Sequence, residues 1–98
     1  MRLYHRSEQA ARIMREGFRN GRGTYGTTHV FTGVWLASYP LSCGEGGQTG
    51  EEPCIRVEIP ARVIKEYEWI EEGKTYREWL VPAALVNRYP RKLMRRTT

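Results

Sequence analysis

The chain has 98 residues, of which 40% are hydrophobic and 28% are charged, and its formal net charge is +5. This length predicts one small domain, residues 1–98, and excludes a second domain with a cleft between the two. The composition is globular, and no apolar run resembles a signal peptide or a membrane span, so we expect a cytoplasmic protein.

The charges are distributed unevenly along the chain. Nine of the eleven acidic residues lie between positions 45 and 78, whereas residues 88–98 contain no acid. The basic residues of that segment are Arg88, Arg91, Lys92, Arg95 and Arg96. Such a basic C-terminal segment is either a solvated terminus or the footprint of an anionic partner, which would be nucleic acid or a phosphate-bearing ligand.

The first predicted elements are a short strand at residues 2–5 and a helix that follows it. Ser7 is a candidate N-cap, and Glu8 is well placed for the helix dipole. Apolar residues then recur at helical spacing as far as Phe18, and Gly17 suits the C-terminal end of the helix. Residues 19–29, RNGRGTYGTTH, are rich in glycine and threonine and predict a loop.

The middle of the chain predicts two strands with a long loop between them. Residues 33–38 (GVWLAS) and 54–59 (CIRVEI) have strand patterns, and Pro60 ends the second. Residues 42–53 are glycine-rich and predict a flexible loop. Cys43 and Cys54 flank this loop; they could pair, but a reducing compartment favours free thiols.

The last third predicts a β-hairpin. Residues 61–66 are ambiguous, with one helical turn as the alternative to a loop. YEWI (67–70), the turn EEGK and TYREWLV (75–81) form the hairpin, with Gly73 in the turn. Pro82 begins a short helical turn, and residues 87–94 predict a final strand. The sum is an α+β fold with one early helix, several strands and long loops.

A carboxylate lies in the middle of the second hairpin strand. Tyr76, Glu78 and Leu80 share one face of such a strand. Glu78 is therefore either a surface residue that pairs with Arg77 or Lys74, or a functional group among apolar neighbours. The sequence contains no zinc pattern, Walker loop, dinucleotide-binding GxGxxG or nucleophile elbow that would indicate another chemistry.

Three segments together resemble the ADP-ribosyltransferase fold in its diphtheria-toxin-like branch. LYHRSEQAARIMREGF (3–18) resembles the opening strand that ends in His and leads into a helix. GVWLAS (33–38) resembles the second motif, and REWLVP (77–82) resembles the third, in which an aromatic residue follows the catalytic Glu. The motifs occur in the family's order. The resemblance implies a compact split antiparallel β-sheet core with one N-terminal helix and long loops.

The resemblance also implies the site residues, with NAD as the substrate and no metal. Glu78 would be catalytic, and His5 would hydrogen-bond a ribose hydroxyl of NAD. Trp35, where the family usually has Tyr, would stack on the nicotinamide ring. Both have ordinary alternatives, a His satisfied at a strand end and a Trp of the core. The other residues implied at the NAD site are Arg6, Ser7, Tyr25, Gly33 and Ser38.

The implied reaction needs only one carboxylate. Cleavage of the nicotinamide–ribose bond develops positive charge on the ribose, and a carboxylate hydrogen-bonded to the 2′-hydroxyl stabilises that charge. Nicotinamide leaves as a neutral base and needs no acid. The arginine-specific branch has Glu or Gln two residues before the catalytic Glu, and Tyr76 stands there, which disfavours arginine as the acceptor.

The acceptor of ADP-ribose could be a protein, a nucleic acid or a small molecule, and such compact transferases often act as toxins or effectors. Arg6, where the poly-ADP-ribose branch has Gly, could instead meet a phosphate. That substitution suggests a second interpretation, an NAD-dependent RNA 2′-phosphotransferase. A third hypothesis is a non-enzymatic nucleic-acid-binding module that uses the basic ends and exposed aromatic residues.

Overall fold

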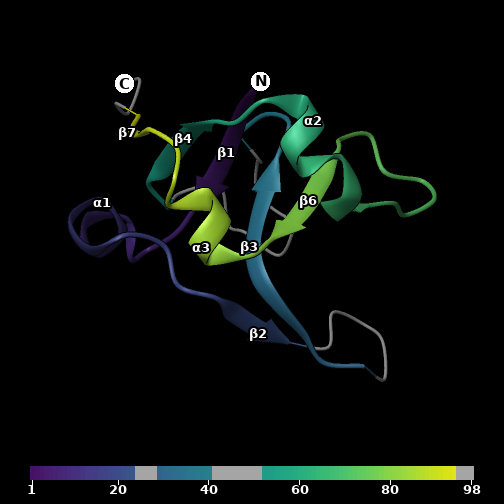
Figure 1. Cartoon of the computed structure of the whole chain (residues 1–98), viewed down its shortest axis with the longest axis horizontal. Coiled ribbons are helices and arrows are strands. Elements are labelled where there is room, and N and C mark those ends of the chain that lie inside the picture. The colour runs from purple at the N-terminus through teal and green to yellow at the C-terminus, as the bar shows by residue number, and fades with distance from the viewer. Residues whose placement is uncertain (24–28, 41–51, 95–98) are drawn as a thin grey trace.

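The computed structural model describes residues 1–23, 29–40 and 52–94, and it confirms an α+β fold built on one antiparallel sheet (Figure 1). The strands are β1 (Arg2–Arg6), β2 (Gly21–Gly23), β3 (Phe31–Ala37), β4 (Cys54–Glu58), β5 (Glu68–Trp69), β6 (Glu78–Val81) and β7 (Arg91–Leu93). The helices are α1 (Ala10–Glu16), α2 (Ala61–Ile64), the 3-10 turn η1 (Lys65–Tyr67) and α3 (Ala83–Val86).

The strand order is β5–β6–β3–β1–β4–β7, and β2 pairs separately with β3. Strands β6, β3 and β1 are therefore consecutive in the middle of the sheet. The β1–β4 ladder runs the full length of both strands, from the Arg2–Glu58 pair to the Arg6–Cys54 pair. By contrast, β1 and β3 share a single registered pair, Tyr4 with Ala37.

One face of the sheet, the core face, carries the hydrophobic core. Leu3 pairs with Val57 and Leu36 pairs with Trp79, and none of these four side chains is more than 1% exposed. In Figure 1, α2 and α3 lie in front of the strands. The helices contribute Ile13, Ile64 and Val86 to the same cluster. Burial of these apolar side chains on one face of the sheet is what stabilises so small a domain.

The first helix begins later than the sequence predicts. Ser7 does not cap it directly, because its Oγ accepts a hydrogen bond from the Gln9 N–H (3.0 Å) and its carbonyl accepts one from Ala10 N–H (3.2 Å). These bonds form a turn before the helix, which starts at Ala10. Gly17 ends the helix as predicted, with φ of 93° and its N–H donating to the Ile13 carbonyl.

The predicted hairpin forms, but its strands are shorter than expected. Trp69 pairs with Glu78, so residues 70–77 make a long connection in which Gly73 has φ of 84°. Lys74 belongs to this connection and not to β6, and its Nζ donates a hydrogen bond to the Glu78 carboxylate. The predicted loop at residues 19–29 also contains β2, whose Gly21 pairs with Gly33.

Within the described residues, no helix has the length and apolar character that crossing a membrane would require. Cys54 is a free, buried thiol, and burial raises its pKa. Cys43 lies outside the described residues, as do Arg95 and Arg96 of the basic C-terminal segment.

Asn87 joins the segment after α1 to the end of α3. Its Oδ1 accepts a hydrogen bond from the Phe18 N–H (2.7 Å), and its Nδ2 donates to the Phe18 carbonyl (2.9 Å). Asn87→Ala removes both partners from the backbone of a buried residue, so we expect a loss of about 2 kcal/mol in the free energy of unfolding. Urea unfolding measures this value.

Arg88→Ala is the matched control, because Arg88 is an exposed neighbour on the same turn. We expect it to change the free energy of unfolding by less than about 0.5 kcal/mol. Equal losses in the two variants would contradict the structural role of the Asn87 side chain.

Candidate functional site

The second face of the sheet, opposite the core face, carries a row of directly paired residues that crosses all the strands from β5 to β7. Directly paired residues point to the same side of a sheet. The pairs link Trp69 to Glu78, Glu78 to Ala37, Ala37 to Tyr4, Tyr4 to Arg56 and Arg56 to Lys92. Glu78 is thus on the second face, between an aromatic residue of β5 and the small Ala37.

Aromatic side chains gather beside Glu78 on this face. Trp35 lies two residues before Ala37 and pairs with Leu80, so it shares the face with Glu78. Its ring meets Trp69 edge to face with the centroids 5.3 Å apart, and Trp69 meets Phe31 at 4.9 Å. The structure therefore brings together two of the predicted site residues, Trp35 and Glu78.

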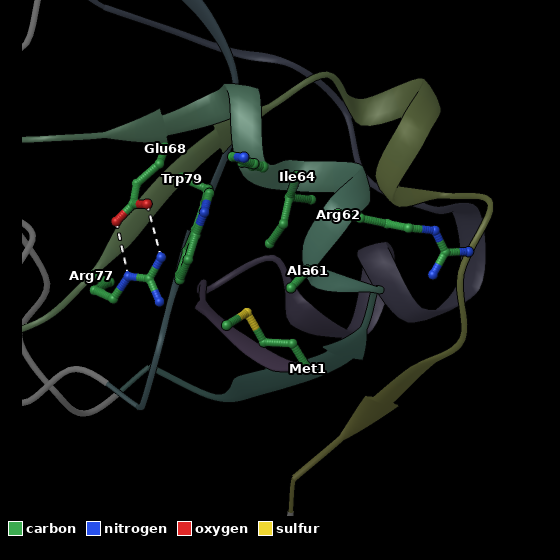
Figure 2. A pocket seen from close by; sticks show the side chains of 8 residues that line it. Met1, Ala61, Arg62, Ile64, Glu68, Arg77 and Trp79 are labelled. Carbon is green, nitrogen blue, oxygen red and sulfur yellow. Dashed lines mark hydrogen bonds and ion pairs between the residues drawn. The ribbon is translucent and has the colours of Figure 1, made fainter.

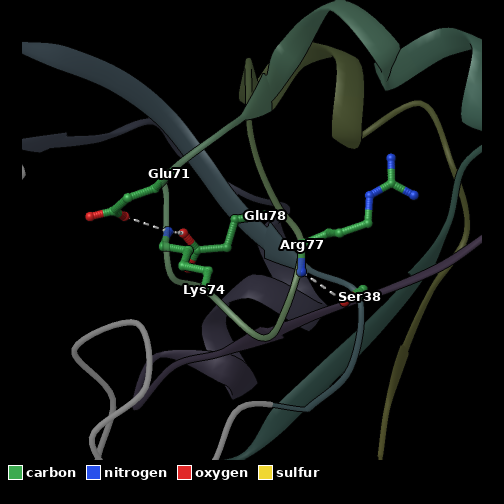
Figure 3. A network of polar contacts seen from close by, with 5 residues as sticks. All are labelled: Ser38, Glu71, Lys74, Arg77 and Glu78. Atoms are coloured by element: carbon green, nitrogen blue, oxygen red, sulfur yellow. Dashed lines mark hydrogen bonds and ion pairs between the residues drawn. The ribbon is translucent and has the colours of Figure 1, made fainter.

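Glu78 is a nearly buried carboxylate, and Figure 3 shows its cationic partner, Lys74. Glu78 is 6% exposed. Lys74 Nζ donates to Glu78 Oε2 and also lies 2.9 Å from Oε2 of the exposed Glu71. The pairing with Lys74 that the sequence suggested is present, but on a buried rather than a surface carboxylate. Arg77 makes its bonds elsewhere, with Glu68.

The contacts of Lys74 keep it charged. Burial lowers the pKa of Lys74, but its hydrogen bonds to Glu78 and Glu71 outweigh burial, and the pKa is raised above its ordinary value. An ammonium group therefore faces Glu78 throughout the neutral pH range. This attraction offsets part of the cost of removing the carboxylate from water.

His5 lies on the core face, away from Glu78. It pairs with the buried Ile55, and its ring meets Phe18 edge to face at 5.3 Å. Its Nδ1 donates to the Trp35 carbonyl at 2.7 Å, and because a carbonyl only accepts, Nδ1 carries the proton. Burial lowers the pKa of His5, although the bond to Trp35 acts in the opposite direction. His5 thus connects β1 to β3, and its predicted contact with NAD stays a prediction.

Arg6 and Ser7 follow His5 at the end of β1. Arg6 is on the second face, opposite Cys54, and its Nη1 donates to the Glu52 carbonyl at 2.7 Å. Ser7 forms the turn before α1, and its N–H donates to the Pro53 carbonyl at 3.0 Å. Both residues therefore attach the start of β4 to the end of β1. Arg6 also lies on the same face of the sheet as Glu78.

Gly33 and Ser38, at the two ends of β3, have packing roles. Gly33 has φ of 152°, and a Cβ there would lie 3.0 Å from the Leu80 side chain and 3.1 Å from the Val81 carbonyl, so only glycine permits this approach of β3 to β6. Ser38 continues the ladder, since its Oγ accepts from the Arg77 N–H at 3.1 Å. Tyr25, the remaining predicted NAD contact, lies outside the described residues.

A shallow hollow of about 340 Å³ lies on the core side of the sheet, at the edge formed by β5 (Figure 2). Arg77 lies over the Trp79 ring, 4.9 Å from its centroid, and makes a bidentate bond to Glu68 at 2.8 and 2.9 Å. The hydrogen bond from Arg77 lowers the pKa of Glu68. The paired charges stabilise this edge, and the hollow does not include Glu78 or Trp35.

Sequence reasoning did not single out Trp69 or Phe31, which complete the aromatic cluster. The predicted hairpin was the one signal for Trp69, because pairing YEWI with TYREWLV places Trp69 opposite the strand that carries Glu78. Which residue Trp69 pairs with depended on the length of the connection between β5 and β6. Tyr76 is outside β6, and its ring meets Tyr39 edge to face at 6.0 Å.

Within the described part of the chain, no group of three or more His, Cys, Asp or Glu side chains could hold a metal ion. No protein-family model, no curated protein and no solved structure matches the chain significantly. The function is therefore inferred from the residues of the site.

The Lys74–Glu78 pair gives the first prediction for the site. Lys74→Met leaves the nearly buried Glu78 without its cation, and we expect a loss of about 3 kcal/mol in the free energy of unfolding at pH 7, measured with urea. Glu71→Gln removes only the exposed partner of Lys74 and should cost less than about 1 kcal/mol. The double variant Lys74→Met/Glu78→Gln should be more stable than Lys74→Met alone. Equal losses for Lys74→Met and Glu71→Gln would contradict this account.

The half-buried His5 gives a prediction on pH. Its folded pKa is below the ordinary value of 6.5, so the unfolded chain binds more protons between the two values. The contribution of neutral His5 to stability is complete above pH 6.5 and decreases as the pH falls through 6.5 toward the folded pKa. Urea unfolding at pH 7.5 and 5.5 should show this loss in the wild type and a smaller loss in His5→Gln, which is neutral at both pH values. The same pH dependence in both proteins would refute the assignment.

Proposed function

We propose that this protein is a small NAD-consuming ADP-ribosyltransferase with Glu78 as its catalytic residue. The observation that carries the proposal is that the three motif segments form neighbouring strands. Residues 3–18, 33–38 and 77–82 are far apart in the sequence, yet they supply β1, β3 and β6, which are consecutive in the sheet. A site shared by the three segments requires them to be close in space, and neighbouring strands meet that requirement.

The junction between β1 and β3 also supports the proposal. The family resemblance implies a split sheet, and in this sheet β1 and β3 have a single registered pair, Tyr4 with Ala37. His5 contributes to this junction through the Trp35 carbonyl. In the proposal, His5 is a positioning residue and not the NAD contact that the resemblance implies, because it lies on the core face and holds the strand that carries Trp35.

The second face offers suitable groups for the nicotinamide end of NAD. Trp35 and Trp69 provide aromatic surface for the nicotinamide ring. Lys74 binds Glu78 Oε2, and no described residue donates to Oε1, so a ribose 2′-hydroxyl could donate to Oε1 while Lys74 stays in place. Lys74 would then fix the orientation of the carboxylate during the reaction.

The chemistry follows from a fixed carboxylate with little exposure to water. The bond between ribose C1′ and the nicotinamide nitrogen breaks, and its electron pair leaves with neutral nicotinamide. Glu78, bonded to the 2′-hydroxyl, stabilises the positive charge that develops on the ribose. An acceptor oxygen or nitrogen then bonds to C1′ and loses its proton. The low exposure of Glu78 strengthens this attraction relative to water.

Nicotinamide release tests the proposal. The purified protein incubated with NAD should release nicotinamide, detected by chromatography. Glu78→Gln keeps the shape of the side chain but removes its charge, and we expect the rate to fall about 100-fold to 1000-fold. Glu71→Gln is the control, because Glu71 belongs to the same network through Lys74 but its side chain is exposed.

The outcomes separate the proposal from its alternatives. An active Glu78→Gln protein would overturn the catalytic role of Glu78. No nicotinamide release together with no thermal shift on adding NAD would favour a non-enzymatic binding module. Removal of phosphate from a 2′-phosphorylated oligonucleotide in the presence of NAD would identify an RNA 2′-phosphotransferase instead.

A further inference from the structure

Beyond Ala37, toward β7, the residues of the second face are mainly basic. On β1, β4 and β7 this face carries Arg6, Arg56 and Lys92 around the aromatic ring of Tyr4. Tyr4, Arg56 and Lys92 belong to the same row of direct pairs as Glu78, and Arg6 lies two residues along β1 from Tyr4. We call this region the basic half of the second face.

The side chains of the basic half are less buried than those of the core face on the same strands. On the core face of the same strands, Leu3, Ile55 and Val57 are fully buried. On the basic half, Tyr4 and Arg56 are half-buried and Lys92 is exposed. An alternating strand with one buried face and one face of basic and aromatic residues presents the latter to a partner or to water.

Two of the three cations of the basic half, Arg56 and Lys92, have no acidic partner among the described residues. Glu58 is the acidic side chain of β4 on this face, and it pairs with Arg2 at 3.3 Å. This surface therefore attracts anions, in agreement with the net charge of +5.

The basic half leads away from Glu78. Neighbouring strands lie about 4.8 Å apart, so Arg56, three strands from Glu78, is roughly 14 Å away across the sheet, and Lys92 is roughly 19 Å away. A ligand that used these groups while reacting at Glu78 would be long and would carry negative charge along its length. A nucleic-acid strand has both properties.

We propose that the basic half binds a single-stranded nucleic acid, and that this strand is the acceptor of ADP-ribose. Arg56 and Lys92 would bind phosphates, and Tyr4 would stack with a base, which is how non-specific single-strand sites combine charge with aromatic platforms. A single strand fits better than a duplex, because a base stacked inside a duplex cannot reach Tyr4. Binding of the strand stands apart from the proposed function, and only its role as acceptor rests on it.

The transfer step balances with the strand as nucleophile. A hydroxyl or ring nitrogen of the bound strand forms a bond to ribose C1′ after the bond from C1′ to nicotinamide breaks. The electron pair of the broken bond leaves with nicotinamide, and the proton of the nucleophile passes to solvent. Neither an oxidant nor a metal is required.

Fluorescence anisotropy with a labelled single-stranded oligonucleotide, in the absence of NAD, tests the binding. Arg56→Gln/Lys92→Gln should weaken binding at least tenfold at low salt. The slope of log K against log salt should fall by about 1.4, since each lost phosphate contact on a single strand contributes about 0.7. Tyr4→Leu should weaken binding about tenfold, whereas Tyr4→Phe, which keeps the ring, should not.

Arg62→Gln/Lys65→Gln is the matched control. It removes the same charge from exposed residues of α2 and η1, on the core side of the sheet. We expect this variant to bind the oligonucleotide within about twofold of the wild type, because only screened, long-range attraction is lost. Urea unfolding of each variant checks that the fold is retained.

Three results would overturn the proposal. The first is an equal loss of binding in the two double variants, which would indicate general attraction by net charge. The second is tighter binding of a duplex than of the single strand. The third is a loss of NAD affinity, without a loss of oligonucleotide binding, in Arg56→Gln/Lys92→Gln. Nicotinamide release by the wild type without oligonucleotide reports separately on the proposed function, so either idea can fail alone.

Discussion

The junction between β1 and β3 is the constraint on which the rest of the structure depends. These strands share one registered pair, Tyr4 with Ala37, and a hydrogen bond from His5 to the Trp35 carbonyl at 2.7 Å. On one side of the junction lie β6 and β5, and on the other lie β4 and β7. The relative position of the aromatic cluster and the basic half is therefore set here. His5 also packs against the core, because its ring meets Phe18 edge to face at 5.3 Å.

The two faces of the sheet have different roles: one stabilises the fold, and the other carries the proposed site. The core face buries enough apolar surface to stabilise a domain of 98 residues, with Leu3, Leu36 and Val57 inaccessible to water. The second face holds Glu78 at 6% exposure, although a hydrophobic residue of similar volume is often at least as favourable at such a position. In the proposal, the chemical role of the carboxylate explains why a charged group, paired with Lys74, occupies this nearly buried position.

The proposed NAD site and the proposed nucleic-acid site are compatible, because both lie on the second face of one continuous sheet. Aromatic rings lie beside Glu78, the buried Ala37 follows on β3, and basic groups follow on β4 and β7. A dinucleotide at the aromatic end and a phosphate-bearing chain at the basic end would meet near Ala37. This arrangement needs no cleft between domains, so a single sheet can serve as the whole platform.

The sequence by itself determined the α+β class, the strands around Tyr4, Trp35 and Glu78, and the end of α1 at Gly17, because side-chain periodicity and glycine conformation are local properties. Periodicity also put Glu78 and Leu80 on one face. It could not say that Trp69 lies beside Glu78, that Arg56 and Lys92 continue the same row, or that His5 faces the core. Those facts depend on which strands are neighbours and in which register, and long-range pairing decides both only when the core is packed.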